Sequence, residues 1–382
     1  MSSGDFKRRM PEASSDLRRR DSILMKLHID LPLLILLSMI TAYGLVVLYS
    51  ASGQSWHYVE RQSIFFGLAY VAMFAAAQIR MQTYEYWAPW FFGLGVVLLI
   101  GVLLIGVGAK GAQRWLDLGV IRFQPSEILK LGMPIMIASY LAKRLLPPSF
   151  KHVFWSLVFI GVPTILIMRQ PDLGTSLLVA FSGLMVLFFA GLRWRYILSA
   201  VGLIVASAWP IWHYGLHAYQ KQRILTLLDP EADKLGSGWN IIQSKTAIGS
   251  GGIEGKGWLN GTQSQLDFLP ESHTDFIIAV LAEEFGLRGV LYLLVLYLAV
   301  IGRSMWIAFN AQHMFGRLLA GSITFTFFIY IFVNIGMVSG LLPVVGVPLP
   351  LVSHGGTSII TLMLGFGVLM SVSTEKKLVG NQ

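Results

Sequence analysis

The chain has 382 residues, of which 55% are hydrophobic and only 13% are charged, and its formal net charge is +9. Soluble domains carry roughly 25% charged residues, so this composition excludes an ordinary soluble domain and predicts an integral membrane protein. The chain has no cysteine, which excludes a disulfide framework, a cysteine metal site and a thiolate nucleophile.

Residues 1–27 are polar and basic and precede the first apolar run. This segment is too long for the positive region of a signal peptide, and the run after it is long enough to span a bilayer. We therefore expect a cytoplasmic basic tail near anionic lipid, a polytopic membrane domain over residues 28–374, and a short cytoplasmic tail over residues 375–382.

Long apolar runs dominate the rest of the chain. About 20 apolar residues are needed to cross ~30 Å of hydrocarbon, and backbone polar groups in lipid must be satisfied internally. The expected fold is therefore an all-α membrane protein with about ten transmembrane helices. The predicted spans are 29–51, 62–80, 86–108, 125–142, 153–169, 173–191, 196–213, 275–301, 317–340 and 355–373.

Basic residues are unevenly distributed among the connections. With the N-terminus inside, they gather in the cytoplasmic connections, for example at Lys143, Arg193 and Arg303. The positive-inside rule then predicts that both termini are cytoplasmic and that the long loop at about 213–274, between spans seven and eight, is extracytoplasmic. The net positive charge is thus a topology signal, and we expect no nucleic-acid partner.

A first polar cluster lies between spans three and four, and it contains Arg114, Trp115, Gln124, Ser126, Glu127 and Lys130. Glu127 and Lys130 are three residues apart, so they share a helix face and can pair. One interpretation is a capped helix with a lysine that reaches toward the interface. The other is a cationic and carboxylate lining for a polar headgroup. Trp115 is most simply an interfacial anchor.

A second polar cluster, around Asp172, begins span six with the same order of Gln, Pro and acid as the start of span four. A third lies in the long loop, where residues 239–248 have the period of an amphipathic helix that could lie at the interface. The following Gly-rich segment fails the P-loop pattern, because Ser250 and Gly257 stand where Gly and Ser or Thr are required. We expect it to be a glycine hinge that carries Lys256.

The long loop ends at Asp275, just before the eighth span. Ser272 and Asp275 have the spacing of a capping box, which predicts a helix N-terminus. The alternative is a carboxylate held at the mouth of the membrane domain as a general base. Within the same span, Glu284 and Arg288 have the i, i+4 spacing of a pair.

A fourth cluster, residues 342–356, has three prolines and three glycines in an apolar stretch. Such a stretch cannot continue as a helix, and irregular backbone at membrane depth must be covered by protein or line a cavity. We expect His354 within it to be hydrogen-bonded rather than a ligand.

These clusters, in this order, resemble the SEDS family (shape, elongation, division and sporulation). The resemblance covers nearly the whole chain after about residue 28. It is carried by GAQRWLDLG, RFQPSEI, QPDLGTS, LLDPE, IIQSK, HTDF and NIGMVSG. Agreement over so many separated blocks is specific, because a hydropathy profile alone would not produce it.

The resemblance implies a peptidoglycan glycosyltransferase of the bacterial cytoplasmic (inner) membrane. Such an enzyme polymerises lipid II into glycan strands at the outer face during cell elongation and rod-shape maintenance. It implies a class B penicillin-binding protein, the transpeptidase, and other elongation complex proteins as partners, together with membrane lipid. The family's essential loop aspartate corresponds to Asp275, and the Glu and Lys of its fourth helix correspond to Glu127 and Lys130; these three are the catalytic candidates.

In this reaction a sugar hydroxyl attacks an anomeric carbon and expels a lipid diphosphate. A positioned carboxylate base contributes about 10²–10⁴-fold, and Asp275 is the candidate. The diphosphate calls for cations from the chain or for a divalent ion such as Mg²⁺ or Mn²⁺, for which the sequence has no ligand motif. The candidate substrate-binding residues are Arg114, Trp115, Gln124, Ser126, Asp172, Lys245, Lys256, Gln263 and His273.

Two other functions stay open from the sequence. Ten spans with broken helices are also typical of a transporter, which here would flip lipid II across the membrane, and fold does not fix function. A non-catalytic scaffold that recruits a partner helix is the third hypothesis.

Overall fold

The structure is a computed structural model that describes residues 27–109, 112–117, 122–216, 218–233, 237–265 and 272–375. The basic tail before residue 27 and the segment after residue 375 lie outside these residues. Each of the ten predicted spans coincides with a helix in the described part. The long helices are α2 (Leu31–Ala51), α3 (Trp56–Ala77), α4 (Met81–Ile105), α5 (Pro125–Ala142), α6 (Phe150–Met168), α7 (Leu173–Phe189), α8 (Trp194–Pro210), α12 (Ile277–Asn310), α13 (Met314–Val338) and α14 (Thr357–Thr374).

Shorter elements fill the connections. Between α4 and α5 the chain forms a three-stranded antiparallel sheet in the order β1-β2-β3, so the fold is mostly helical rather than all-α as expected. The strands are β1 (Val107–Ala109), β2 (Ala112–Asp117) and β3 (Arg122–Phe123). The long loop holds the π-helix η2 (Ile211–Gly215), α9 (Ala218–Leu228), the 3₁₀-helix η3 (Pro230–Asp233), α10 (Ser237–Gly251) and α11 (Thr262–Gln265).

Seven of the described helices are long and apolar enough to cross a membrane: α2, α4, α6, α8 with its continuation to Gly215, α12, α13 and α14. Helix α7 is apolar but has only 17 residues, fewer than the ~20 that usually cross the hydrocarbon core. Helix α5 carries Glu127 and Lys130, and α3 carries Glu60 and Arg61, which lowers their hydropathy. The chain is therefore a multi-pass membrane protein, and its exact number of spans and its orientation stay predictions.

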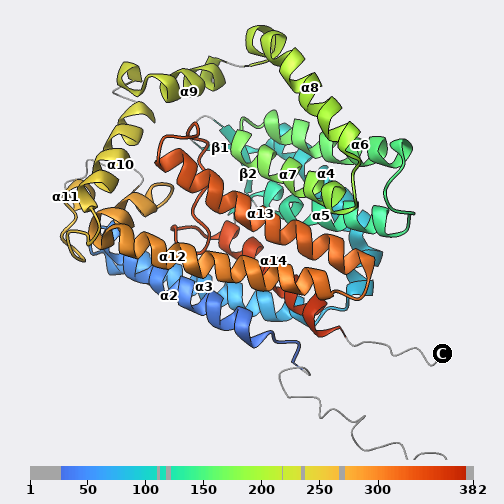
Figure 1. Cartoon of the computed structure of the whole chain (residues 1–382), viewed down its shortest axis with the longest axis horizontal. Coiled ribbons are helices and arrows are strands. Elements are labelled where there is room, and N and C mark those ends of the chain that lie inside the picture. The colour runs from blue at the N-terminus through green and yellow to red at the C-terminus, as the bar shows by residue number, and fades with distance from the viewer. Residues whose placement is uncertain are drawn as a thin grey trace, which may run out of the picture.

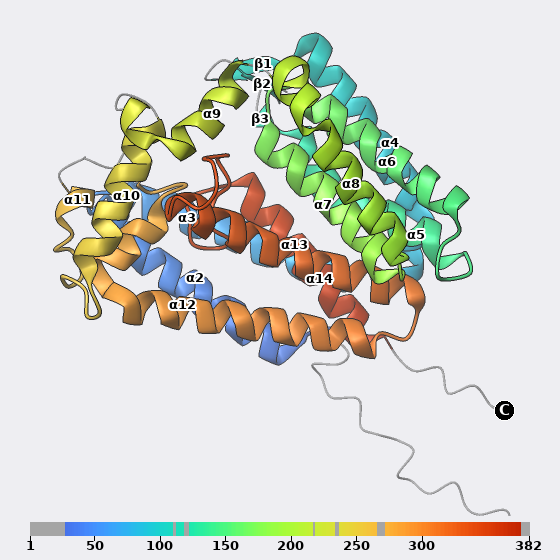
Figure 2. The ribbon, with the colours of Figure 1, turned by 45° about the horizontal axis from the view of Figure 1, so that its top comes forward.

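Helices α13 and α14 run through the middle of the molecule, with α2, α3 and α12 on one side and α4 to α7 on the other (Figures 1 and 2). Helix α13 is lined by fully buried side chains such as Leu319, Ser322 and Asn334. Helix α8 buries none of its residues, and the chain passes from it through α9 to α10, which lies beside α12 (Figure 1). The polar part of the long loop thus returns to the α12 side of the bundle.

At the end of the bundle where α2 begins, one carboxylate joins three helices. Asp30 caps α2. Arg303 of α12 donates to both oxygens of the Asp30 carboxylate, at 3.0 and 2.8 Å, and the Ser373 hydroxyl donates to the same carboxylate at 2.8 Å. Burial raises the pKa of the Asp30 carboxyl, but the hydrogen bonds from Arg303 and Ser373 outweigh it and hold the pKa below the usual range. The carboxylate therefore stays charged and ties α2, α12 and α14 together.

Candidate active site

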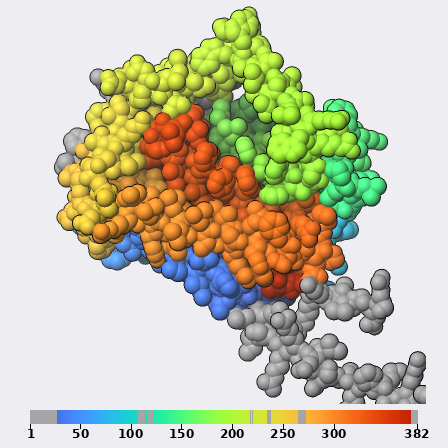
Figure 3. Space-filling model, in the orientation of Figure 1, coloured from blue at the N-terminus to red at the C-terminus, as the bar shows by residue number. Residues whose placement is uncertain are grey.

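The proline-rich loop 342–356 lies at the centre of the polar residues. Its apolar side chains Val347, Leu349, Leu351 and Val352 are buried, as the sequence predicts for irregular backbone covered by protein. The Tyr297 hydroxyl donates to the carbonyl of Pro350 at 2.6 Å and fixes the loop to α12. Figure 3 shows the surface hollowed between this part of the chain, in red, and the green helices.

Asp275 lies in a turn that precedes α12, which begins at Ile277 with Phe276 as its N-cap. Phe276 offers no side-chain cap, and the hydroxyl of Ser272 donates instead to the carbonyl of Ala51 at 3.0 Å. The capping-box prediction is therefore wrong, because Ser272 anchors the turn to the end of α2 and stands outside the helix. The Asp275 side chain is half-buried and borders loop 342–356, since a Cβ added to Gly346 would lie 3.5 Å from Asp275 Oδ2.

Aromatic rings gather immediately before Asp275. The ring of Tyr58 on α3 lies 5.0 Å from that of His273 and 5.3 Å from that of His354. Burial first, and then the electrostatic influence of the neighbouring His273 and Arg61, lowers the pKa of His354, so its ring is neutral at pH 7. Its buried Nδ1 has no hydrogen-bond partner among the described residues, so the expectation of a hydrogen-bonded ring is wrong at that atom.

The starts of α5 and α7 meet at a second polar group. Gln124 Nε2 donates to Asp172 Oδ2 at 3.2 Å, and Asp172 also caps α7 by accepting from the backbone N–H of Thr175. Arg114 reaches this group from β2, with its Nη2 donating to the carbonyl of Pro171 at 2.6 Å and its Nε 3.8 Å from Asp172. The sequence placed Arg114 and Asp172 in separate clusters, and folding brings them together.

Deeper in α5, Lys130 Nζ donates to Glu127 Oε1 at 2.7 Å, which confirms the predicted pair. Both side chains are more than 90% buried, and the ammonium lies 5.4 Å from the centre of the Tyr330 ring on α13. Glu127 Oε2 and the hydroxyl of Ser126 have no partner among the described residues. The pair is therefore desolvated rather than a surface ion pair.

Loop 342–356 connects these groups to Asp275. A Cβ added to Gly174, two residues after Asp172, would lie 2.8 Å from the carbonyl oxygen of Val345. Val347 packs with Tyr330, whose ring lies near the Lys130 ammonium. Gly346, between Val345 and Val347 in the chain, borders Asp275. One short loop thus touches the start of α7, the Lys130 group and the Asp275 carboxylate.

Lys256 and Gln263 belong to a different arrangement. The buried carboxylate of Glu283 accepts from Lys256 Nζ at 2.7 Å and from the backbone N–H groups of Thr262 and Gln263 at 2.8 and 2.9 Å. The charge of Lys256 is therefore already balanced by Glu283.

The Gly-rich turn that carries Lys256 is hydrogen-bonded to α12, and its role as a hinge stays a prediction. Backbone N–H groups of Lys256 and Gly257 donate to the carbonyls of Glu283 and Glu284 at 3.0 and 2.9 Å. Helix α12 is broken opposite the turn at Gly286, whose φ of 63° and ψ of −163° only glycine adopts readily. The turn and the helix break fit against each other through backbone atoms.

The predicted pair of Glu284 and Arg288 does not form. The hydroxyl of Ser50 donates to the buried Glu284 carboxylate, whereas Arg288 pairs with Glu254 at 3.1 Å on the surface. The helix break at Gly286 separates the two residues, so the i, i+4 geometry of a continuous helix is lost.

Helix α10 confirms the predicted helix at 239–248, but it lies against protein. The Ser244 hydroxyl donates at 2.8 Å to the carbonyl of Val338, the last residue of α13. The exposed Lys245 side chain crosses Gly340, since a Cβ there would lie 2.6 Å from Lys245 Nζ. Lys245 is therefore near the beginning of loop 342–356. Trp115, by contrast, is half-buried on β2.

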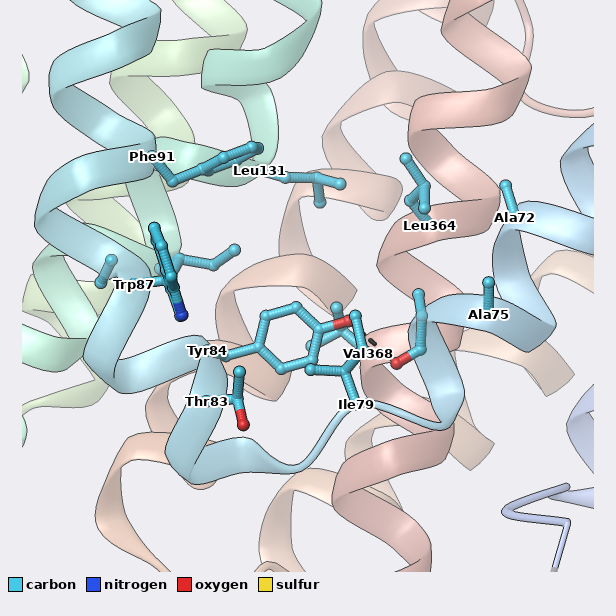
Figure 4. Close-up of a pocket in the computed structure, with 13 residues that line it drawn as sticks. Ala72, Ala75, Ile79, Thr83, Tyr84, Trp87, Phe91, Leu131, Leu364 and Val368 are labelled. Carbon is cyan, nitrogen blue, oxygen red and sulfur yellow. Dashed lines mark hydrogen bonds between the residues drawn. The ribbon is translucent and has the colours of Figure 1, made fainter.

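Two further features bear on ligands. Among the described residues, no group of three or more His, Asp or Glu side chains could hold a metal ion. A cavity of about 550 Å³ between α3, α4, α5 and α14 is lined almost wholly by apolar side chains, including Tyr84, Trp87, Leu131 and Val368 (Figure 4). It offers no carboxylate or cation for chemistry on a polar headgroup, so the polar groups around loop 342–356 are the candidate site.

Sequence reasoning missed Tyr58, Tyr330, Asn334 and Ser353, each of which contacts a residue of this site or its neighbour in the chain. Each of them stands in an ordinary apolar helix or in the proline-rich loop, and each partner is far away in sequence. Only the intramembrane position of Asn334 is unusual, because polar side chains within membrane helices are rare.

The family model of a cell cycle protein, named for FtsW, RodA and SpoVE, matches residues 30–378. The chain is 54% identical over 353 residues to the peptidoglycan glycosyltransferase MrdB of Escherichia coli strain K12, covering 92% of this chain and 95% of MrdB. It is 36% identical to the probable peptidoglycan glycosyltransferase FtsW of Trichlorobacter lovleyi, covering 91% and 94%.

Solved structures of relatives share the fold. A chain from a peptidoglycan synthase complex, described as coordinating polymerization and crosslinking, superposes with a TM-score of 0.80 at 30% identity, covering 91% of this chain and 98% of its own. The rod shape determining protein RodA of Thermus thermophilus superposes with a TM-score of 0.68 at 30% identity, covering 90% and 96%.

Proposed function

This chain belongs to the cell cycle protein family of FtsW, RodA and SpoVE, the SEDS family, and we propose that it is a peptidoglycan glycosyltransferase with Asp275 as its general base. The observation that carries the role of Asp275 is its position. It is a half-buried carboxylate beside loop 342–356, which also touches the start of α7 and the ring above Lys130.

The reaction is a single displacement on lipid II. The C4 hydroxyl of an acceptor N-acetylglucosamine gives its proton to Asp275, and its oxygen forms a bond to the anomeric carbon of a donor N-acetylmuramic acid. The bond from that carbon to the diphosphate oxygen breaks, the electron pair leaves with the lipid diphosphate, and the configuration inverts. Asp275 suits the first step, because a sugar hydroxyl is a weak nucleophile near neutral pH without a base.

The leaving diphosphate requires positive charge. The candidate cations fall into two groups, those already paired with a carboxylate and those available to a ligand. Lys130 and Lys256 are held by Glu127 and Glu283 at 2.7 Å. Lys245 is exposed beside the start of loop 342–356, and Arg114 is one-third exposed and loosely paired, so these two are assigned to the diphosphate. A divalent cation would take most of its ligands from the diphosphate, as Mg²⁺ does at phosphate sites with one or two carboxylates.

Glu127 and Lys130 are assigned to the site beneath loop 342–356. Their desolvated pair supports the ring of Tyr330, on which Val347 packs. Gln124 and Asp172 join the starts of α5 and α7 at the same place, so they would fix the outline of the site and present polar groups to the substrate. Gln263 contributes its backbone N–H to Glu283, which leaves its side chain for the substrate.

The orientation follows from the distribution of basic residues. Both termini would lie in the cytoplasm, so Asp275 and loop 342–356 would face the periplasm at the outer side of the inner membrane. The related chain in the synthase complex supports a class B penicillin-binding protein as partner, and the identity to MrdB supports a place in cell elongation and rod-shape maintenance.

The test uses the purified chain with its transpeptidase partner, lipid II and Mg²⁺ in detergent, with glycan polymer measured on gels. Asp275→Asn is expected to lower the polymerisation rate by about 10²-fold or more. Glu254→Gln is the matched control, because Glu254 is an exposed carboxylate of the long loop that pairs only with Arg288 among the described residues.

Polymerisation by Asp275→Asn at the rate of the unchanged protein would show that Asp275 is not the base. The competing function, flipping of lipid II, has no meaning in detergent. An unchanged protein that forms no polymer with its partner present, yet moves lipid II across a vesicle membrane, would establish the transporter instead.

A further inference from the structure

Three consecutive backbone carbonyls that end at Asp275 are each hydrogen-bonded by the C-terminal part of the chain. The donor and acceptor pairs are His354 N and His273 O at 2.9 Å, Ser353 Oγ and Thr274 O at 2.5 Å, and Asn334 Nδ2 and Asp275 O at 2.9 Å. We name these three donors the carbonyl clamp. It joins the turn before α12 to α13 and to loop 342–356.

Asn334 is the central member of the clamp. It lies one turn before the end of α13 and is completely buried. Its amide group also donates to the carbonyl of Val347 at 2.7 Å, so both N–H bonds are used on two segments that are distant in sequence. Both partners are carbonyls, which can only accept, and this fixes the orientation of the amide.

The other half of the clamp is itself held rigidly. The hydroxyl of Ser353, besides donating to Thr274, accepts from the backbone N–H of Leu349 at 2.8 Å. The buried side chain of Gln62 on α3 donates to the carbonyl of Ser353 at 3.1 Å and accepts from the N–H of Gly355 at 3.2 Å. The donors that hold the turn therefore cannot shift without disturbing α3 as well.

The geometric consequence concerns the direction of the Asp275 side chain. The carbonyl of Thr274 belongs to the peptide plane before the Cα of Asp275, and the carbonyl of Asp275 belongs to the plane after it. Fixing both planes fixes φ and ψ of Asp275, and with them the direction of its Cα–Cβ bond. Only the two side-chain torsions are then left to place the carboxylate.

The amide oxygen of Asn334 has no hydrogen-bond partner among the described residues. A buried unsatisfied oxygen costs stability, so the helix would gain little from an asparagine here for packing alone. The two hydrogen bonds from its nitrogen are the property that an apolar residue could not supply.

We propose that Asn334 is a positioning residue for Asp275, with Ser353 as its assistant, an inference that rests on the proposed role of Asp275 as base. Through Val347, which packs on Tyr330, the same amide also keeps Asp275 in register with the Lys130 group. Asn334 touches no substrate in this role, so its loss impairs the chemical step and leaves substrate binding intact.

The experiment measures kcat and KM for lipid II polymerisation by Asn334→Ala, with thermal unfolding in detergent as a check of folding. A displacement of about 1 Å of a catalytic group can cost 10²-fold, so kcat is expected to fall by about 10²-fold while KM changes by less than about threefold. The matched control is Ser322→Ala, because Ser322 is a fully buried residue of the same helix whose hydroxyl donates at 2.6 Å to the carbonyl of Ser182, away from Asp275. Its kcat is expected to be unchanged.

A second variant covers the possibility that Asn334→Ala does not fold. Ser353→Ala removes the hydrogen bond to Thr274 and the acceptor for the N–H of Leu349, and kcat is expected to fall by about tenfold. Ser353→Thr keeps the hydroxyl and is expected to restore kcat. The positioning role is overturned if folded Asn334→Ala, or Ser353→Ala in its place, keeps the kcat of Ser322→Ala, or if KM rises while kcat holds. Unchanged polymerisation by Asp275→Asn would contradict the base assignment separately.

Discussion

Replacing Lys130 by methionine tests how strongly the bundle depends on its buried ion pair. Methionine keeps a similar length and apolar stem but removes the ammonium that lies 2.7 Å from Glu127 Oε1 and 5.4 Å from the centre of the Tyr330 ring. The carboxylate of Glu127 would then be buried without its cation, and its second oxygen already has no partner among the described residues.

The magnitude follows from burial. Breaking a buried pair by removing one partner costs about 3–5 kcal/mol, because an uncompensated charge is left in the interior. The double variant Glu127→Gln/Lys130→Met buries no charge, so it is expected to recover most of this loss. An exposed pair provides the comparison: Arg288 and Glu254 are 70% and 75% exposed, and Arg288→Met is expected to cost no more than about 1 kcal/mol.

The assay is reversible unfolding of the purified protein by titration of a denaturing detergent, followed by tryptophan fluorescence. The same samples are tested for polymerisation, where the double variant is expected to be stable but inactive if the ammonium is needed at the site. A loss of stability in Lys130→Met no greater than that in Arg288→Met would refute the reasoning. So would a double variant that is as unstable as Lys130→Met.

Three other predictions follow from single residues. Gly286→Ala is expected to lower the free energy of unfolding by at least about 2–3 kcal/mol, because Gly286 has a φ of 63° and an added Cβ would lie 2.4 Å from backbone. The control Gly302→Ala, at an exposed position of the same helix, should be neutral or stabilising by up to about 1 kcal/mol. Unfolding titrations of both variants measure the difference. Arg303→Lys keeps the charge but loses the bidentate hydrogen bonds to Asp30, so its melting temperature is expected to be lower than that of the unchanged protein. An equal melting temperature would contradict the importance of the bidentate geometry. The pKa of His354 lies below 6.5, so the unfolded chain binds a proton at higher pH than the folded protein does; stability should fall as pH decreases from 6.5 toward the folded pKa, and His354→Gln should flatten that part of the stability–pH curve.

Local features of this protein could be predicted from the sequence. The ten helices follow from apolar runs of sufficient length, and the pair of Glu127 and Lys130 follows from a spacing of three on one helix. The helix at 239–248 follows from its period. These predictions hold because their causes act within one helical segment.

Predictions that assumed ideal local geometry were wrong. The capping box at Ser272 and the pair of Glu284 and Arg288 both have the right spacing. Helix α12 starts later than the first requires, and its break at Gly286 separates the second pair. In both cases a tertiary contact outweighed the local preference: the bond of Ser272 to Ala51, and the backbone fit between Gly286 and the Gly-rich turn.

The sequence by itself determined the membrane class, the succession of helices, and the family resemblance that singled out Asp275. The tertiary structure alone decided what holds Asp275 in place, because Asn334 reaches its carbonyl across 59 residues of chain and Ser353 reaches the carbonyl of Thr274 across 79. No periodicity or spacing records such contacts. They exist only because α13 and loop 342–356 pack against the turn before α12, and a buried carbonyl there must find a donor from whichever segment lies next to it.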